Sequence, residues 1–463
     1  MESSYPYKTV VLIGVGYIGL HLASRILESE TDYDLYCYDI NPTASRAKAI
    51  SMLSTTEDIN YNTYEKISQA MYSLEDTIEQ TKNKNKIIIS TVPIATMAVG
   101  EDLVFYGDLY KAYHTMSKLI MPGDLIISES SGPVGTTRKL IDTIENSYDN
   151  GFTDRRLSYP GDFNVAYCPE RTNPGDKVNT IETIVQPISS DFNSVSLLAE
   201  RFYKSIGVKN TIISESIEAT EMSKLVENSQ RYINIQFMNE VSMICESNGV
   251  SFSEVNKINK TKWNFSEFSP GLVGGPCLLD NVKYLSTGVE THILKESQEV
   301  DSKYTLNTSN KFAAKLSNTL ASIINSHKEN NEINIYLVGM GFKHGSTEPI
   351  KSKILEVIDD ALAEIKIRQL NKRVRFFIAD FYFMVKEQYK NTNLLRLEGY
   401  NKDVISSQGL RMGMRPYEYR TDILESDLDR ADLFILGNTT DDIDRRVYDL
   451  SVKHNFKILK VHN

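Results

Sequence analysis

The sequence has few cysteines and no long apolar run. Four cysteines occur in 463 residues, and they form neither a CxxC pair nor a Cys/His spacing typical of a metal site. We therefore expect free thiols, no disulfides and no metal ion. No apolar stretch is long enough to span a bilayer, and the first residues lack a cationic segment followed by an apolar one. These absences favour a cytoplasmic protein without a membrane partner.

An excess of basic charge is also lacking. The chain has 51 Lys and Arg against 61 Asp and Glu, for a formal net charge of −10. This balance argues against a nucleic-acid partner, which a basic stripe would normally indicate. A nucleotide ligand is still compatible, because such a site needs only a few backbone amides and one or two cations. The length predicts two or three domains, and we find no internal repeat, low-complexity tract or long linker.

The first strong pattern is a glycine-rich turn between a strand and a helix. Residues 8–13 (KTVVLI) predict a strand, GVGYIGL follows at Gly14–Leu20, and apolar residues then recur at helical spacing. Strand, GxGxxG and helix in this order predict a dinucleotide site, with the pyrophosphate held by amides at the helix start. The residues expected to contact the cofactor here are Gly14, Gly16, Tyr17, Ile18 and Gly19.

An acidic residue follows the second predicted strand. Asp34–Tyr38 reads as a strand and ends at Asp39, about twenty residues beyond Gly19. A carboxylate at this position binds the ribose 2′-hydroxyl and repels a 2′-phosphate, so we predict NAD rather than NADP as the cofactor. The alternative is a tight turn in an α/β domain that binds no ligand.

Two more strand-to-loop junctions repeat the pattern. Lys86–Ser90 runs into Thr91–Pro93, and Asp124–Ser128 runs into ESSGPVGTT at Glu129–Thr137. In a doubly wound sheet the ligand lies at the carboxyl ends of the strands, where these loops fall. We expect Thr91, Pro93 and Ser130 to line the cofactor site. The alternative for either loop is an ordinary connection between a strand and a helix.

Three further segments contain candidate chemistry. Cys277 follows GGP at the start of a predicted helix, where the helix dipole favours a thiolate, although a buried structural cysteine is the alternative. Glu170 lies in CPERTNPG after a predicted strand, and an exposed ion pair with the next arginine is its alternative. In the long helix predicted over Ser216–Asn248, Lys224 and Asn228 share one face with Glu221, as functional groups or as a solvated surface.

Taken together, these motifs resemble the nucleotide-sugar dehydrogenases, a family that includes UDP-glucose 6-dehydrogenase and the UDP-N-acetylhexosamine and GDP-mannose dehydrogenases. The resemblance rests on GVGYIGL, SSGPVGTT, PER, EMSKLVEN and GGPC, and on IYLVGMGFKHGSTEP at Ile335–Pro349, which is similar to the family's third-domain GLAFK-type turn. It extends over nearly the whole chain, with the motifs in the family's order.

The resemblance implies a role for each matching residue. Cys277 would capture a C6 aldehyde as a thiohemiacetal, which a second oxidation converts to a thioester, and Lys224 would stabilise the C6 oxyanion. Glu170 would position or activate the hydrolytic water. The other residues that the family pattern singles out are Asn228, Gly274, Gly275 and Lys343 at the substrate, and Ser131 in place of a family threonine.

The chain departs from the family in two motifs. The family's catalytic Asp stands four residues after the Cys, where this chain has Asn281, with Asp280 one residue earlier. We favour a one-residue deletion that leaves Asp280 in the acid's role, the alternative being that this acid is lost. The arginine of the late T-D-D-x-R-x-S pattern is also missing, because Ile350 stands in its register with Lys351 beside it, and lysine offers charge without a planar fork. No clear equivalent exists of the arginine that some members supply from a neighbouring subunit; Lys260 and Lys262 are the nearest cations.

The sequence therefore predicts an α/β protein with two Rossmann-like sheets. We expect an NAD-binding domain over residues 1–210, a central helical dimerisation domain with the Cys loop over 211–325, and a nucleotide-sugar domain over 326–463. In the last part, strands are predicted at Ile333–Val338, Val374–Ala379 and Leu433–Leu436, after a helix over Ser302–Asn325.

The predicted activity is oxidation of a UDP-hexose, first UDP-glucose to UDP-glucuronate, with two NAD, by a homodimer formed through the central helices. UDP-N-acetylhexosamine and GDP-mannose dehydrogenases are alternatives in the same class. A catalytically silent protein that binds NAD and a nucleotide sugar is the alternative from another class. A one-step hydroxyacid or 6-phosphogluconate-type dehydrogenase ranks below these, because it explains neither Cys277 nor a third domain.

Overall fold

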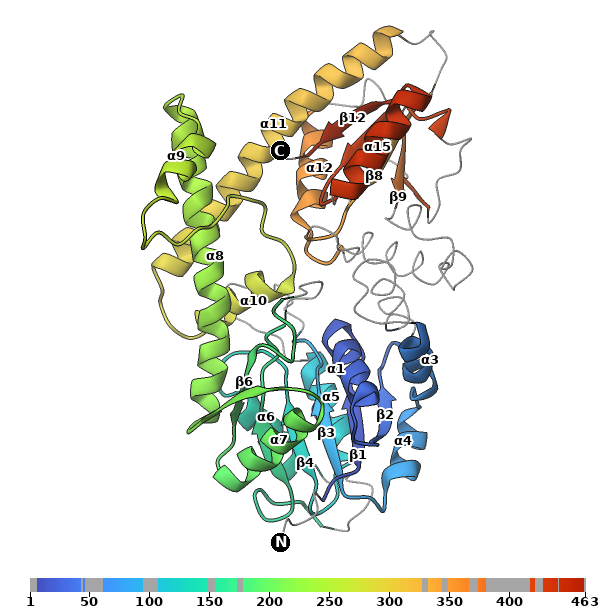
Figure 1. Ribbon diagram of the computed structural model, residues 1–463, viewed down its shortest axis with the longest axis vertical. Helices are drawn as coiled ribbons and strands as arrows, with labels where there is room; N and C mark the ends of the chain where they lie inside the picture. Colours follow the sequence, from blue (N-terminus) through green and yellow to red (C-terminus); the bar gives the residue numbers. More distant parts are fainter. Residues whose placement is uncertain are drawn as a thin grey trace. The chain divides into compact units, whose positions relative to one another are not determined.

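A computed structural model shows the chain as two compact units, which are described separately below (Figure 1). The first comprises Met1–Glu227 and Lys283–Val289, and the second comprises Asn228–Val282 and Glu290–Asn463. The three domains predicted from the sequence have other boundaries. The division into two units does not test them, so they stay a prediction. The structure describes residues 6–42, 45, 61–94, 107–147, 155–172, 178–326, 332–343, 349–365, 374–379, 417–420, 428–439 and 441–461.

The first unit alternates strands and helices. Its described elements are β1 (Thr9–Ile13), α1 (Tyr17–Glu28), β2 (Asp34–Tyr38), α3 (Tyr61–Gln69), α4 (Leu74–Thr81), β3 (Lys86–Ser90), α5 (Gly107–Ser117), β4 (Leu125–Ser128), α6 (Thr136–Glu145), β5 (Asn164–Tyr167), β6 (Val185–Ser189), α7 (Asn193–Ser205) and β7 (Asn210–Ser214). Helix α8 (Ile217–Ser247) begins in this unit and ends in the second.

These strands form one sheet in the order β2-β1-β3-β4-β5-β6-β7, in which only the β5–β6 pair is antiparallel. The chain leaves β1 toward β2 on one side and continues with β3 on the other. The strand order therefore reverses between β1 and β3, which makes this the topological switch point where ligands bind in such sheets.

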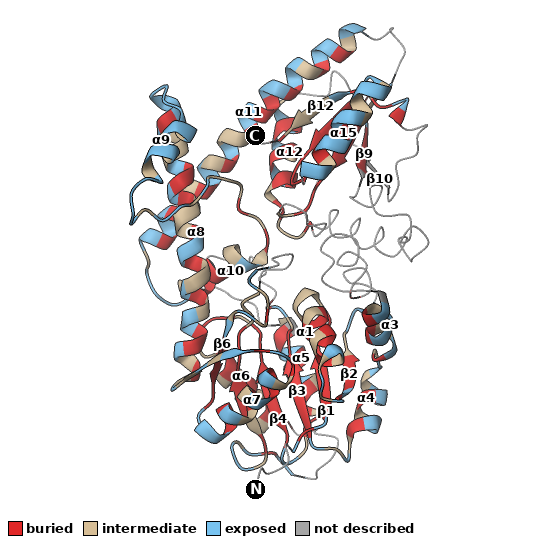
Figure 2. Ribbon diagram, viewed as in Figure 1, coloured by how far each residue is buried: buried red, intermediate tan, exposed pale blue. Residues whose placement is uncertain are grey.

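The runs of β-branched residues form the buried strands because both faces of the sheet are covered. Residues of β1 alternate between the faces: Val10 and Leu12 pack with α1, α3 and α7, whereas Val11 and Ile13 pack with α5 and α6. Figure 2 shows β1, β3 and β4 buried throughout, with exposed residues on the outer sides of the helices. The carboxyl ends of these strands are thus held by a rigid core.

The second unit contains the remaining described elements: α9 (Phe252–Asn259), α10 (Pro276–Leu285), α11 (Ile293–Ser326), β8 (Ile333–Val338), α12 (Lys353–Glu364), β9 (Val374–Ala379), β10 (Tyr417–Arg420), β11 (Leu433–Leu436), α15 (Asp441–His454) and β12 (Lys457–Lys460). Helix α10 runs across the division between the units.

Its five strands form an all-parallel sheet in the order β10-β9-β8-β11-β12, which reverses between β8 and β11. Helices α11 and α12 cover one face through Leu316 and Ile358, and α15 covers the other. On the second face the ring of Tyr336 stacks between Phe377 and Phe434, at centroid distances of 4.7 and 5.1 Å. The prediction of an α/β fold with two Rossmann-like sheets is confirmed.

Most predicted elements agree with the structure within one or two residues, and Gly249 ends α8 in a left-handed conformation (φ 66°) as expected of a C-cap. One prediction was too short, because α11 begins at Ile293 rather than at Ser302. Its first turns bury the small or polar side chains Ser297 and Asp301, so no apolar period marks them. Strands β6, β7, β10 and β12 were not predicted. Asp380, which follows the predicted strand Val374–Ala379 directly in the sequence, lies outside the described residues.

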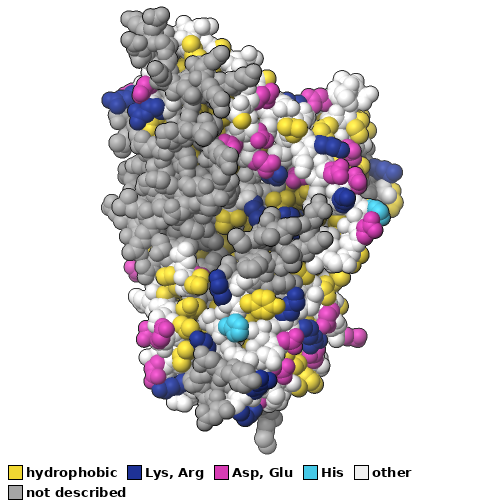
Figure 3. All heavy atoms as spheres, turned by 180° about the vertical axis from the view of Figure 1, so that it is seen from behind, with side chains coloured by type: hydrophobic (Ala, Val, Ile, Leu, Met, Phe, Trp, Pro, Cys, Tyr) yellow, Lys and Arg dark blue, Asp and Glu magenta, His cyan; other side chains and the backbone are white. Residues whose placement is uncertain are grey.

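Among the described helices, none combines the length and apolar character needed to cross a membrane. On the face shown in Figure 3, acidic and basic side chains of the described residues are interspersed rather than gathered by sign.

A buried ion pair joins the amino ends of β3 and β4. Lys86 Nζ lies 2.8 Å from Asp124 Oδ2, both side chains are fully buried, and Asp124 also accepts the backbone N–H groups of Lys86 and Met121. Removing one partner leaves an uncompensated buried charge, so we expect Asp124→Ala to destabilise the first unit by about 3–5 kcal/mol, seen as a lower urea midpoint by circular dichroism.

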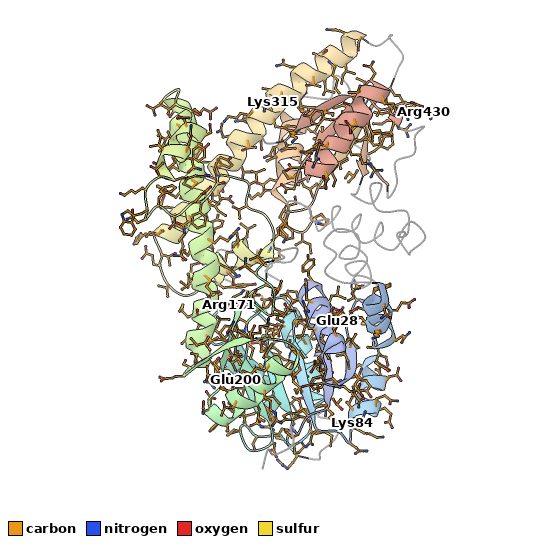
Figure 4. The ribbon with its side chains drawn as sticks, viewed as in Figure 1. Glu28, Lys84, Arg171, Glu200, Lys315 and Arg430 are labelled. Atoms are coloured by element: carbon orange, nitrogen blue, oxygen red, sulfur yellow. The ribbon has the colours of Figure 1, made fainter. Side chains whose placement is uncertain are left out.

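Asp34→Ala is the matched control for this prediction. It breaks the exposed Lys84–Asp34 pair (3.2 Å), near the labelled Lys84 in Figure 4, and should cost about 0–1 kcal/mol. Equal effects of the two substitutions would contradict a special contribution of the buried pair.

Candidate active site

The glycine turn after β1 has the close packing that a dinucleotide site requires. Gly14 has φ 88°, and a Cβ on Gly19 would lie 2.1 Å from the carbonyl oxygen of Gly14, so neither position accepts a side chain without rearrangement. A Cβ on Gly16 would meet no atom within 4 Å, which leaves open space beside the N-terminus of α1. Tyr17 and Ile18 form the first helical residues. This cradle fits the pyrophosphate of a dinucleotide.

Asp39 lies at the same edge of the sheet. Its Oδ2 accepts the N–H of Val15 at 2.7 Å, and its Oδ1 accepts the N–H of Asn41 at 2.7 Å. The carboxylate is therefore fixed against the glycine turn at the end of β2, where a ribose of NAD would lie. The described residues fit the cofactor expected from the sequence.

The loops after β3 and β4 complete this edge. Thr91 donates from Oγ1 to the carbonyl of Gly14 at 2.5 Å, which ties the β3 loop to the glycine turn across the switch point. The hydroxyl of Ser130 lies 3.5 Å from that of Ser90, and Pro93 is exposed. The structure thus brings Thr91 and Ser130 to the edge predicted for the cofactor.

Glu170 and Lys224 meet in the first unit. The ammonium of Lys224, on α8, donates to the backbone carbonyl of Glu170, whose side chain accepts the N–H of Thr172. Arg171 pairs with Glu227 one turn further along α8 and donates to the carbonyl of Val185 at 2.9 Å (Figure 4). Glu170 is consequently not paired with Arg171, which was its alternative interpretation.

Helix α8 is fixed to the β4 loop by a buried carboxylate. Glu221 accepts the N–H of Gly135 at 2.7 Å, and the N–H and hydroxyl of Thr137 at 2.8 and 2.6 Å. These groups lie at the N-terminus of α6, where Gly135 (φ 91°) supplies no side-chain cap, so Glu221 replaces that cap. Lys224 follows one turn later, while Ser131 in the same loop hydrogen-bonds Tyr167. The loop and α8 therefore hold a common position.

Glu129, a buried acid directly after β4, is not among the site residues predicted from the sequence. Its Oε1 accepts the hydroxyl of Tyr203 at 2.5 Å, and its Oε2 has no hydrogen-bond partner among the described residues. Burial, with a smaller contribution from the charge of Glu170, raises the pKa of Glu129 to about 8. The position of an acid between a buried strand and a run of small residues was a signal that could have identified it.

The Cys loop lies in the second unit. Cys277 is the second residue of α10 and is exposed, whereas Cys37, Cys168 and Cys245 are buried, and the structure shows no disulfide at these four described residues. The turn before it is close-packed, since a Cβ on Gly275 (φ 82°) would lie 2.5 Å from the ring of Phe342, and one on Gly274 would lie 2.9 Å from the carbonyl of Lys351. The thiol is thus presented at a helix N-terminus, as predicted.

Asp280 and Asn281 behave differently on α10. Asp280 pairs with Lys351, at 2.5 Å between Oδ1 and Nζ, whereas Asn281 donates from Nδ2 to the carbonyl of Cys277 in its own helix. Asn228 is half-buried on α8, one turn after Lys224 and at the start of the second unit.

The second sheet has its own close-packed switch point. Gly339 (φ 78°) follows β8, and a Cβ on Gly437, after β11, would lie 2.5 Å from its carbonyl oxygen. Asn438 donates from its backbone to Gly339 and from its side chain to Gly341, each at 2.8 Å. Lys343, from the predicted nucleotide-binding turn, lies nearby in sequence, with Nζ 5.9 Å from the ring centroid of Phe342. The described residues show no cluster of His, Cys, Asp and Glu arranged for a metal ion.

Two models of one protein family match the chain. The NAD binding domain of the UDP-glucose/GDP-mannose dehydrogenase family matches residues 8–206, and the central domain of that family matches residues 218–308.

Individual proteins are similar over most of the chain. The UDP-N-acetyl-D-glucosamine 6-dehydrogenase of Pseudomonas aeruginosa is 27% identical over 78% of this chain and 81% of its own. The UDP-N-acetyl-D-mannosamine dehydrogenase of Pyrococcus horikoshii is 28% identical over 77% of this chain and 82% of its own. A solved structure of a UDP-D-ManNAc dehydrogenase from Pyrococcus horikoshii superposes with a TM-score of 0.67 at 22% identity, covering 98% of this chain and 95% of that one. The solved structure shows a shared fold.

The raised pKa of Glu129 predicts a pH-dependent stability. Between its ordinary pKa of 4.5 and about 8, the unfolded chain binds fewer protons at this carboxyl than the folded chain does. The contribution of Glu129 to the free energy of unfolding therefore falls as pH rises through this window. Glu129→Gln removes the titrating group, so its urea midpoint should decline less than that of the wild type between pH 5 and pH 8.

Glu240→Gln provides the control, because Glu240 is exposed on α8. Its midpoints should run parallel to those of the wild type. Parallel curves for Glu129→Gln as well would show that Glu129 does not titrate in this window.

Proposed function

The chain belongs to the UDP-glucose/GDP-mannose dehydrogenase family, and on that premise we propose that it oxidises C6 of a UDP-N-acetylhexosamine to the carboxylate. Its cofactor is NAD, for which residues 8–206 form the family's binding domain. The observation that carries the proposal is the exposed Cys277, at the N-terminus of α10, in a chain whose relatives are named as UDP-N-acetylhexosamine dehydrogenases. The sequence alone favoured UDP-glucose, and the relatives support the acetamido sugars instead.

The proposed reaction removes four electrons from one carbon. When bound at the glycine turn, NAD supplies the hydride acceptor for both oxidations. Cys277 adds its thiolate sulfur to the C6 aldehyde, which makes a thiohemiacetal; loss of a second hydride leaves a thioester on the same sulfur. Water then attacks the thioester carbon, the C–S bond breaks, and the thiol is restored with release of the acid.

Charged groups of the first unit would assist these steps. Lys224 provides a cation for the oxyanion at C6, and its position is fixed by the carbonyl of Glu170 and, one turn away, by Glu221. Glu170 accepts the proton of the attacking water. Asn228 and Ser131 would contact the sugar.

The second unit would supply the remaining contacts. Asp280 is proposed as the acid that accompanies Cys277, because it is ion-paired within the unit whereas Asn281 bonds to its own helix. Gly274 and Gly275 give the substrate access to the turn. Lys343, after β8, would bind a phosphate of the nucleotide beside the β8/β11 switch point. The division into domains 1–210, 211–325 and 326–463 stays part of this proposal.

The test of the proposal is the NADH formed per sugar nucleotide consumed, measured with UDP-GlcNAc, UDP-ManNAc, UDP-glucose, UDP-galactose and GDP-mannose. We expect two NADH per sugar on an acetamido sugar, with kcat/KM at least tenfold above that for UDP-glucose. Cys277→Ala should lower kcat by about 10³-fold or more while NAD binding persists, because the aldehyde loses its covalent acceptor.

Two other outcomes of this assay would contradict the proposal. Faster oxidation of UDP-glucose would overturn the substrate assignment and restore the first choice made from the sequence. No NADH on any sugar, with NAD still bound, would instead indicate a silent binding protein.

We further propose a homodimer formed through the central helices of the second unit. Phe237 and Ile244 lie seven residues apart on one face of α8 and are 58% and 54% exposed, and Trp263 is 92% exposed. Large apolar side chains exposed together favour an interface. Sedimentation should therefore give a dimer at micromolar concentration, and the variant Phe237→Glu/Ile244→Glu should be monomeric.

Val452→Glu is the control for this prediction. Val452 is 87% exposed on α15, away from the central helices in sequence, and its replacement should leave the dimer intact. A monomeric wild type, or dissociation by both variants, would contradict the proposed interface.

A further inference from the structure

In the connection from β8 to α12, Lys351 bonds to the Cys loop, while Phe342 packs against the same turn. The backbone carbonyl of Lys351 accepts the N–H of Gly275 at 3.0 Å, and the ammonium of the same residue lies 2.5 Å from Asp280 Oδ1. Lys351 is a non-glycine residue with a left-handed backbone (φ 52°). The adjacent Ser352 donates from its N–H to Pro349 and from its hydroxyl to Gly341, each at 3.1 Å. These bonds hold a conformation that lysine seldom adopts.

The Cys loop is anchored at two points. Asn239, on α8, accepts the N–H of Gly271 at 2.7 Å and donates to its carbonyl at 3.1 Å. Gly275, four residues after Gly271, donates its N–H to the carbonyl of Lys351. A Cβ on Gly274 would lie 2.9 Å from the same carbonyl oxygen, so the turn approaches Lys351 too closely for a side chain. The segment that leads to Cys277 is therefore positioned by α8 at one end and by Lys351 at the other.

The same lysine balances a charge on α10. The side chain of Asp280 is only 8% exposed, and a carboxylate at such a site needs a partner. Asp280 follows Cys277 by three residues, so the two side chains share one face of the helix. An unbalanced carboxylate on that face would disfavour the thiolate of Cys277.

We infer that Lys351 is the positioning residue of the nucleophile, because it fixes the turn before Cys277 and neutralises Asp280 on the same helix face. Its relevance to catalysis rests on the proposed function, in which Cys277 is the nucleophile. The charged residues flanking Cys277 on α10 are Asp280 and Lys283, and those among the described residues of the connection from β8 to α12 are Lys343 and Lys351. This assignment gives the lysine a role in a chain that lacks the family's arginine one position earlier.

The test is the rate at which iodoacetamide alkylates Cys277 in the full chain, followed by mass spectrometry between pH 6 and pH 9. Cys277 is the exposed one of the four cysteines, so its label is readily distinguished. Lys351→Met should slow alkylation about 3- to 10-fold at pH 7.5 and shift the profile to higher pH, because Asp280 then loses its ion pair with Lys351. Lys351→Arg keeps the charge and should stay within about twofold of the wild type.

A charge cycle separates this role from a merely structural one. Asp280→Asn should alkylate at least as fast as the wild type, and Asp280→Asn/Lys351→Met should return to within about twofold of it. Lys353→Met is the matched control, since Lys353 lies two residues away and pairs with Asp301 and Glu356 instead. A double variant as slow as Lys351→Met, or a slow Lys353→Met, would overturn the inference. Asp280→Asn alone tests the sign if Lys351→Met does not fold.

Alkylation requires no sugar nucleotide, so this result is independent of the proposed function. Unchanged alkylation in Lys351→Met would refute the inference even if UDP-GlcNAc is oxidised. The expected alkylation pattern would support it even if no sugar nucleotide is a substrate. In an active enzyme, Lys351→Met should lower kcat more than it changes KM.

Discussion

Close approach of two backbones at the end of a parallel strand is the constraint on which both units depend. In the first sheet, Gly19 packs against the carbonyl of Gly14, and Thr91 bonds to that same carbonyl. In the second sheet, Gly437 packs against the carbonyl of Gly339. Each contact lies where the strand order reverses, and each excludes a Cβ. In both units this geometry leaves the backbone accessible at the carboxyl ends of the strands, which is where ligands bind in such sheets.

Buried charges also hold in place the side chains that are proposed to act on the substrate. Glu221 caps α6 and thereby fixes the helix that contains Lys224, while Lys351 neutralises Asp280 beside the Cys turn. Glu129 differs, because one of its oxygens has no hydrogen-bond partner among the described residues and its pKa is raised to about 8. Glu221 and Asp280 therefore have partners that hold structural elements in place, whereas Glu129, near Glu170, has a pKa close to neutral pH.

The family assignment and the local geometry answer different questions. Membership in the family accounts for the NAD-binding domain and supports the proposed covalent role of Cys277. The departures of this chain, at Asn281 and Ile350, are understood only from contacts: Asn281 bonds to the carbonyl of Cys277, and Lys351 reaches the carboxylate one residue before Asn281. The pair Asp280–Lys351 is consistent with a shifted acid rather than a lost one.

The sequence by itself determined strands β1 to β5, β8, β9 and β11, the glycine turns and the cysteine at a helix start, because β-branched runs, GxGxxG spacing and a GGPC turn are local signals. It also indicated NAD through Asp39. Only the tertiary structure decided which charges are paired, since Glu221 and Thr137 are 84 residues apart in sequence and Lys351 and Asp280 are 71 apart. Rules based on residue spacing do not extend over such distances. The start of α11 was missed for another reason, because its first turns bury polar residues and so lack a helical repeat of apolar residues. Packing between distant elements therefore decides the partners of these charges, whereas local sequence decides the elements themselves.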